Sequence, residues 1–148
     1  MDAVRPTVAS SAPDPQREEQ DVIVRNASEV EGTKADASGP KWRSLRMLTR
    51  ADGMGFTVTQ TTVEEGMVAE LRYANHLEAC YCIEGELEIE DLDTGANHIV
   101  GPRTIYALDR HDHHVVRAKA PTRLVCVFAP ALAGDETHDA SGGYAPAS

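Results

Sequence analysis

From Trp42 onward, apolar and polar residues alternate with a period of two, which predicts β-strands rather than helices. Trp42, Ser44 and Arg46 fall on one face of the first such strand, and Leu45 and Met47 fall on the other. Further strands are expected at 56–63, 70–73, 79–83, 86–90, 98–100, 104–108, 114–118 and 122–128. Short strands at this spacing are typical of a sandwich or barrel, so we expect an all-β fold with one small β-barrel or jelly-roll domain.

The region before Trp42 is less regular. Val22–Val24 is predicted to be a short apolar strand, and Ser28–Glu31 to be one helical turn that ends at Gly32. Residues 1–20 contain three prolines and show no periodicity, which predicts a disordered tail. The expected organisation is a tail at 1–20, a barrel at 21–133 and a C-terminal lid or tail at 134–148.

The C-terminal segment 134–148 is rich in glycine, alanine and serine, as mobile chain ends often are. It also carries Glu136, His138 and Asp139, polar groups that a plain tail does not need. We therefore expect a lid that is loose without substrate and folds over the barrel mouth when substrate binds.

Composition narrows the classes of partner. The chain has 148 residues, enough for one domain with a core, and a net charge of −10, which argues against nucleic acids and anionic membranes. No apolar run is long enough to predict a membrane span, and the N-terminus lacks the apolar core of a signal peptide. The three cysteines fall within predicted strands and form no CxxC motif, which indicates buried thiols and a cytoplasmic protein.

Alternation also selects among the clustered histidines. If Arg117 points to solvent, then His114 and Val116 point inward and His113 points outward. His111 sits in a polar turn. His114 is therefore the best ligand candidate of the cluster, although all of these residues are also compatible with a hairpin loop that has no function.

Glu78 and Tyr106 are the other candidate ligands. Glu78 precedes the apolar segment Ala79–Ile83, both faces of which are expected to be buried. A glutamate at a strand start is usually exposed, but a buried carboxylate needs a partner, which a metal ion would supply. Tyr106 is expected across a hairpin from His114. Together the three residues favour a metal-assisted enzyme over a structural domain.

Two loose motif matches point in the same direction. Glu78 stands seven residues before Gly85, as at the end of the first cupin motif, and Gly95 and Pro102 occupy the region of the second. The usual His-x-His pair is absent, because Arg72–Ala74 lies in its place. The ordinary cupin site of three histidines and one glutamate therefore cannot form.

In the order of its motifs, the chain resembles the ectoine synthase family of cupin enzymes from Val22 to about Tyr144. The matching segments are Trp42-x-Ser44-x-Arg46, Met54-Gly-Phe56, Tyr73-x-Asn-His-Leu-Glu78, Tyr81–Gly85, Tyr106–Asp109, His111-Asp-x-His114, Arg117-Ala118, Arg123–Phe128 and Gly134-x-Glu136-x-His138-Asp139. The chain departs from the common pattern at Arg43, at 70–72, at Ala129 and at its Gly-Gly-Tyr-Ala-Pro end, none of which is a candidate metal ligand.

The resemblance implies a hydro-lyase that cyclises N4-acetyl-L-2,4-diaminobutyrate to L-ectoine with loss of water. It implies an iron(II) site, or another divalent transition metal, at Glu78, Tyr106 and His114. It implies substrate contacts from Trp42, Ser44, Arg46, Thr61, Tyr73, Leu108, Asp112, Cys126, Phe128, Glu136 and His138. Tyr73, Glu136 and His138 are the candidate catalytic residues, and which one is the base stays open.

Other interpretations of the same residues also stay open. Without the resemblance, Trp42 is equally a core anchor and Cys126 a small core residue. The chain could instead be a metal-dependent cupin oxygenase or isomerase, or a cupin that only binds a small ligand. Both faces of the 122–128 strand are apolar, which predicts that a second subunit covers one of them in a homodimer.

Overall fold

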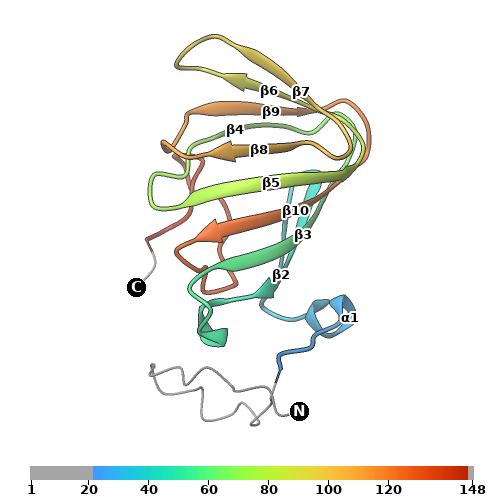
Figure 1. Ribbon diagram of the computed structural model, residues 1–148, viewed down its shortest axis with the longest axis vertical. Helices are drawn as coiled ribbons and strands as arrows, with labels where there is room; N and C mark the ends of the chain where they lie inside the picture. Colours follow the sequence, from blue (N-terminus) through green and yellow to red (C-terminus); the bar gives the residue numbers. More distant parts are fainter. Residues whose placement is uncertain (1–21, 147–148) are drawn as a thin grey trace, which may run out of the picture.

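The protein consists of two antiparallel β-sheets, as seen in a computed structural model that describes residues 22–146 (Figure 1). The predicted tail at 1–20 lies outside the described residues. The six-stranded sheet has the order β1 (Asp36–Gly39), β2 (Trp42–Leu48), β3 (Thr57–Val63), β10 (Thr122–Ala129), β5 (Leu77–Glu84), β8 (Ile105–Leu108). The four-stranded sheet has the order β4 (Val68–Leu71), β9 (His114–Ala118), β6 (Leu87–Asp91), β7 (Asn97–Val100). The all-β, jelly-roll-like prediction is confirmed.

The strands bury the faces that alternation predicts. Along β10, Leu124, Cys126 and Phe128 are buried while the residues between them are exposed. These side chains join Leu87 and Val116 of the other sheet in one core cluster, so the two sheets pack inner face to inner face. In β9, His114 is buried as well, in agreement with the predicted strand phase.

The N-terminal region departs from prediction in two places. The helical turn is confirmed one residue early, as α1 (Ala27–Val30), with a capping box between Asn26 and Glu29. The predicted strand at 22–24 is wrong: the segment pairs with no strand among residues 22–146, and Val24 is 81 % exposed. The unpredicted β1 has no apolar alternation and forms because it pairs with β2. The 3-10 turn η1 (Arg50–Asp52) ends at Gly53, which has a left-handed backbone conformation.

Two other expectations are wrong. Tyr106 and His114 do not face each other across a hairpin, because β8 pairs with β5 whereas β9 pairs with β4 and β6. The polar segment between them carries the chain from one sheet to the other.

The segment Ala79–Ile83 is buried on one face only, since Tyr81 and Ile83 are each about 40 % exposed within this single chain.

After β10 the chain returns across the end of the barrel at which β10 finishes (Figure 1). The backbone N–H of Leu132 donates to Oγ1 of Thr57 at 2.8 Å, and Nδ2 of Asn75 donates to the carbonyl of Tyr144 at 2.9 Å. Tyr144 is buried in the core cluster. Residues 130–146 are named the C-terminal segment from here on. No helix within the described part of the chain is long and apolar enough to cross a membrane.

Candidate active site

A cavity lies between the inner faces of the two sheets. The centres of water molecules could occupy about 60 Å³ of it. One water needs roughly 10–15 Å³ by this measure, so the cavity has room for several waters or a small organic molecule. The C-terminal segment contributes His138 and Tyr144 to its wall. The predicted site residues that line it are Trp42, Ser44, Thr61, Tyr73, Glu78, Tyr106, Cys126, Phe128 and His138.

Glu78 enters the cavity wall from β5 and is 8 % exposed. Because burial disfavours the charged carboxylate, its pKa is raised to about 7, although the nearby thiols of Cys80 and Cys126 lower it in part. Antiparallel pairing places Phe128 opposite Glu78 on β10 and Leu108 opposite it on β8. Leu108 is buried, but it does not line the cavity.

Tyr106 also faces the cavity. It stands opposite Cys80 in the β5–β8 pair and therefore one pleat away from Glu78 on the same face. Burial raises the pKa of its phenol well above the usual value, and the neighbouring Cys80 and Glu78 act in the same direction. In the absence of a cation, the phenol of Tyr106 is neutral at neutral pH, and the carboxyl group of Glu78 is about half protonated.

His114 lies deeper and is 1 % exposed. Its Nδ1 is 2.9 Å from the carbonyl of Asp112, to which it donates, and its Nε2 is buried with no hydrogen-bond partner among the described residues. Burial lowers the pKa of the imidazole, which keeps it neutral. His114 does not line the cavity; its ring centroid is 6.4 Å from that of Tyr73, which does. The side chain of Asp112 accepts from the Arg110 amide.

Tyr73 and His138 form a polar pair at the cavity wall. The Tyr73 hydroxyl is 2.7 Å from Nε2 of His138. Burial, together with the charge of Arg46, lowers the pKa of His138 to about 4, and burial raises the pKa of Tyr73 well above its usual value. A neutral tyrosine therefore donates to a neutral histidine. Trp42 contacts the same imidazole, with ring centroids 5.1 Å apart.

Arg46 is 1 % exposed and sits beside the cavity. Its guanidinium donates to Oγ of Ser44 at 3.0 Å, to the Gly134 carbonyl at 3.0 Å and to the Tyr144 hydroxyl at 3.1 Å. No ion pair joins it to a carboxylate in residues 22–146. Glu136 is close enough to interact with Arg46 through its charge but does not contact it, so the guanidinium is suited to receive a second anionic group.

Glu136 does not line the cavity. Its carboxylate accepts from the backbone N–H groups of Ala133 at 2.7 Å and Gly134 at 2.8 Å. Although burial acts in the opposite direction, these donors lower its pKa. Because its carboxylate is held by backbone donors away from the cavity, whereas Tyr73 and His138 line the cavity, the geometry favours the Tyr73–His138 pair for proton transfer.

Sequence reasoning assigned no role to two residues of the site. Tyr144 stacks on His138 with ring centroids 4.8 Å apart and holds Arg46, but a tyrosine in a glycine-rich end carries no periodic signal. Cys80 lies opposite both Cys126 and Tyr106. Because Cys80 is two residues from Glu78, the sequence alone predicts that the two side chains share a strand face. The sequence does not give the register of β10 against β5, which places Cys126 beside them.

Comparisons with known proteins identify the relatives of this chain. The family model described as "Ectoine synthase" matches residues 22–148. The L-ectoine synthase of Halalkalibacterium halodurans is 47 % identical over 116 residues, which cover 78 % of this chain and 90 % of that protein. The crystal structure of ectoine synthase from P. lautus is 44 % identical, with a TM-score of 0.75 and coverage of 82 % of this chain and 87 % of that one.

A more distant match agrees on the fold alone. An RmlC-like cupin from Shewanella frigidimarina is 15 % identical, with a TM-score of 0.54 over 65 % of this chain and 82 % of that one. The architecture is therefore that of a cupin.

Proposed function

The chain belongs to the ectoine synthase family and is a hydro-lyase, and we propose that it closes the ring of N4-acetyl-L-2,4-diaminobutyrate to form L-ectoine. The α-amine would attack the acetamide carbonyl of the same molecule, forming a C–N bond as the C–O bond breaks and water leaves. One observation supports the proposal: the hydrogen-bonded, uncharged side chains of Tyr73 and His138 line the same cavity between the sheets as the candidate ligand Glu78.

Glu78, Tyr106 and His114 fit a divalent iron ion by their chemistry. His114 donates through Nδ1 and leaves Nε2 buried without a partner, which is the state that a metal-binding imidazole needs. Glu78 is a buried carboxylate without a cationic partner in the described chain. Bound iron, or another divalent transition metal, would supply Lewis-acid polarisation of the acetamide oxygen, worth several kcal/mol.

Arg46 and Ser44 are proposed to hold the substrate carboxylate. Arg46 is a buried cation whose three hydrogen bonds go to neutral oxygens, and Ser44 shares one of them. Charge-assisted bonds to a carboxylate are stronger than bonds to neutral acceptors. Thr61, whose hydroxyl is 3.4 Å from that of Ser44, extends the same polar row.

Proton transfer is proposed to run through Tyr73 and His138. The α-amine is largely protonated near neutral pH and must lose a proton before it attacks. The Tyr73 oxygen can accept that proton as its own passes to Nε2 of His138. Because His138 has a pKa of about 4, it would readily return the proton to the departing oxygen as water leaves.

Exclusion of water is proposed for the C-terminal segment. Ring closure expels water, and a dry enclosed site favours it. In this structure the segment already lies over the barrel end, held by Asn75 and Arg46. We propose that the segment opens to admit substrate and returns during the reaction to the closed position that it has in this structure.

Assembly and location are also proposed. The outer face of β10, β5 and β8 exposes Val125, Val127, Tyr81, Ile83 and Ile105, and β8 is the edge strand of the six-stranded sheet in the described part of the chain. An apolar face of this kind next to an open edge favours a homodimer of this chain. The three buried free cysteines favour a reducing compartment, so we propose the cytoplasm.

Anaerobic incubation of the iron-loaded protein with N4-acetyl-L-2,4-diaminobutyrate tests the function. Mass spectrometry should find a product lighter by one water, formed without oxygen. Turnover that requires oxygen uptake would identify an oxygenase instead. Binding of the compound without conversion in the iron-loaded protein would reduce the chain to a binding protein.

A further inference from the structure

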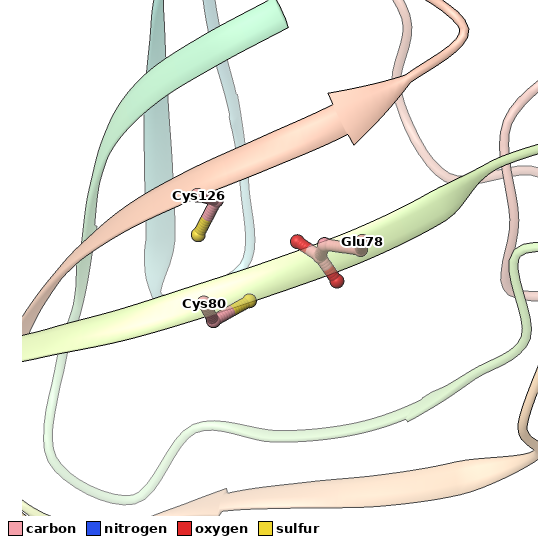
Figure 2. Close-up of side chains that lie close together, drawn as sticks. All are labelled: Glu78, Cys80 and Cys126. Atoms are coloured by element: carbon pink, nitrogen blue, oxygen red, sulfur yellow. The ribbon is translucent and has the colours of Figure 1, made fainter. Parts of the chain in front are cut away.

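Two cysteine thiols lie beside the carboxylate of Glu78 on the inner face of the six-stranded sheet (Figure 2). A carboxylate oxygen of Glu78 and the Sγ atoms of Cys80 and Cys126 all lie within 4.8 Å of one another. The two cysteines are 1 % and 2 % exposed. Among the residues that the structure describes, no other group of three histidine, cysteine or acidic side chains is this close.

Strand register produces this cluster. Glu78 and Cys80 are two residues apart on β5 and so point to the same face. Cys126 stands directly opposite Cys80 on β10. Cys82 shares the face and is fully buried, but its thiol lies 3.5 Å from the Glu84 carbonyl and outside the cluster. The chain therefore provides a matched cysteine that differs only in position.

The donor set differs in kind from that of the proposed iron site. Thiolates are soft ligands that favour zinc and similar ions, whereas carboxylate and phenolate oxygens are hard. Two sulfurs bound to one zinc at about 2.3 Å each lie about 3.8 Å apart in a tetrahedral site. Ligand atoms at most 4.8 Å apart can reach this geometry by side-chain adjustments of about 1 Å or less.

We propose that Glu78, Cys80 and Cys126 form a second coordination site for a thiophilic divalent cation, Zn²⁺ or Cd²⁺. The two thiols each release a proton to solvent and bind as thiolates, and the carboxylate supplies the third ligand. Because the site shares Glu78 with the proposed iron site, a thiophilic cation bound there would compete with iron for this carboxylate and so inhibit the proposed cyclisation. Only this inhibition rests on the proposed function; the coordination of the cation by Glu78, Cys80 and Cys126 does not.

Cobalt(II) provides a direct spectroscopic test, because a cobalt–thiolate bond gives a charge-transfer band in the near ultraviolet. Metal-free full-length protein titrated anaerobically with Co²⁺ should develop this band, and added Zn²⁺ should remove it by displacement. Cys80→Ser and Cys126→Ser should lose the band and bind Zn²⁺ at least about tenfold more weakly, the scale on which even outer-shell changes alter metal affinity. Cys82→Ser should keep the charge-transfer band and the Zn²⁺ affinity of the parent protein.

The thiol reactivity of the unmodified protein provides a second test in case a variant fails to fold. Zn²⁺ should slow the reaction of two of the three thiols with a thiol reagent and leave one unchanged. The proposal is overturned if Co²⁺ gives no thiolate band, if the band survives in both Cys80→Ser and Cys126→Ser, or if Zn²⁺ protects no thiol. None of these measurements uses the substrate, so they stand apart from the assay for water loss.

Discussion

The indole of Trp42 lies directly against the backbone of Gly39, its pairing partner in the β1–β2 hairpin. A β-carbon at Gly39 would be 2.3 Å from Nε1 of Trp42 and 2.6 Å from Cε2. No side chain fits this space, so the indole would have to move. Because Trp42 both lines the cavity and contacts His138, Gly39 sets the position of part of the site without facing it.

Gly39→Ala should therefore impair catalysis more than folding. A displacement of about 1 Å in a positioned group can cost about 100-fold in rate, and we expect a loss of kcat/KM between about tenfold and that limit. Gly101→Ala is the matched control, because a β-carbon there meets nothing within 4 Å. Steady-state kinetics and thermal melting of both variants check this. Equal activity of the two variants would show that the indole is not held by Gly39.

Bound iron should depend on the buried His114 and not on the partly exposed His113. Glu78→Ala, Tyr106→Ala and His114→Ala should each lose most bound iron and most activity, because each removes a proposed ligand. His113→Ala is the control, since its side chain is partly exposed and pairs with Glu70 at 2.8 Å. Iron analysis of the purified variants measures this. Loss of iron from the His113 variant with retention in the His114 variant would contradict the assignment.

The sequence predicted most of the fold because the fold follows from alternation. Nearly every strand from Trp42 onward lies where period two places it, and the inward phase of Cys126 and His114 agrees with the structure. What alternation cannot supply is strand order. Period two is the same whether Tyr106 and His114 face each other across a hairpin or lie in different sheets, and the hairpin prediction was therefore wrong.

The site was predictable to the extent that it lies on strands. Trp42, Ser44 and Thr61 line the cavity because neighbouring strands place them on one face. Tyr144 was missed because it lies in an irregular segment, and its partner Arg46 lies far away in the sequence. The use of Glu136 as a backbone acceptor likewise depends on a local loop geometry without a sequence pattern.

Assembly should depend on the outer face of β10, β5 and β8. Ile105→Lys puts a charge on a side chain that is 61 % exposed at the edge strand, and it should convert a dimer to a monomer at micromolar concentration. Ile99→Lys, at a similarly exposed position on the other sheet, should stay dimeric. Multi-angle light scattering distinguishes the two masses. A parent protein that is itself monomeric at this concentration would contradict the proposed homodimer.

Acid should loosen the C-terminal segment through His138. Its pKa is about 4 in the folded chain against an ordinary value of 6.5, so the unfolded chain binds the proton more tightly. The stabilisation is complete above about pH 6.5 and is lost as pH falls toward 4. Burial and Arg46 lower this pKa, as does His114 more weakly, while Asp139 opposes them.

His138→Gln should therefore make thermal stability less dependent on pH between about 7 and 5 than it is in the parent protein. His98→Gln serves as the control, because His98 is an exposed residue on β7. Melting temperatures measured across this range test the sign as well as the size of the effect. A parent protein whose melting temperature rises on acidification over the same range would contradict the assignment.

Removal of residues 135–148 should separate metal binding from catalysis. The proposed ligands Glu78, Tyr106 and His114 all lie on strands, so the truncated protein should keep most of its iron. It should lose cyclisation, because the cavity loses His138 and Tyr144 and opens to water. Since Tyr144 belongs to the core cluster, some loss of stability is also expected, and Tyr144→Ala, which removes the same ring but leaves His138 in place, controls for it. Iron analysis and mass-spectrometric assay of both variants decide the matter: a truncated protein with near-full activity would show that the C-terminal segment is neither a lid nor a source of catalytic groups.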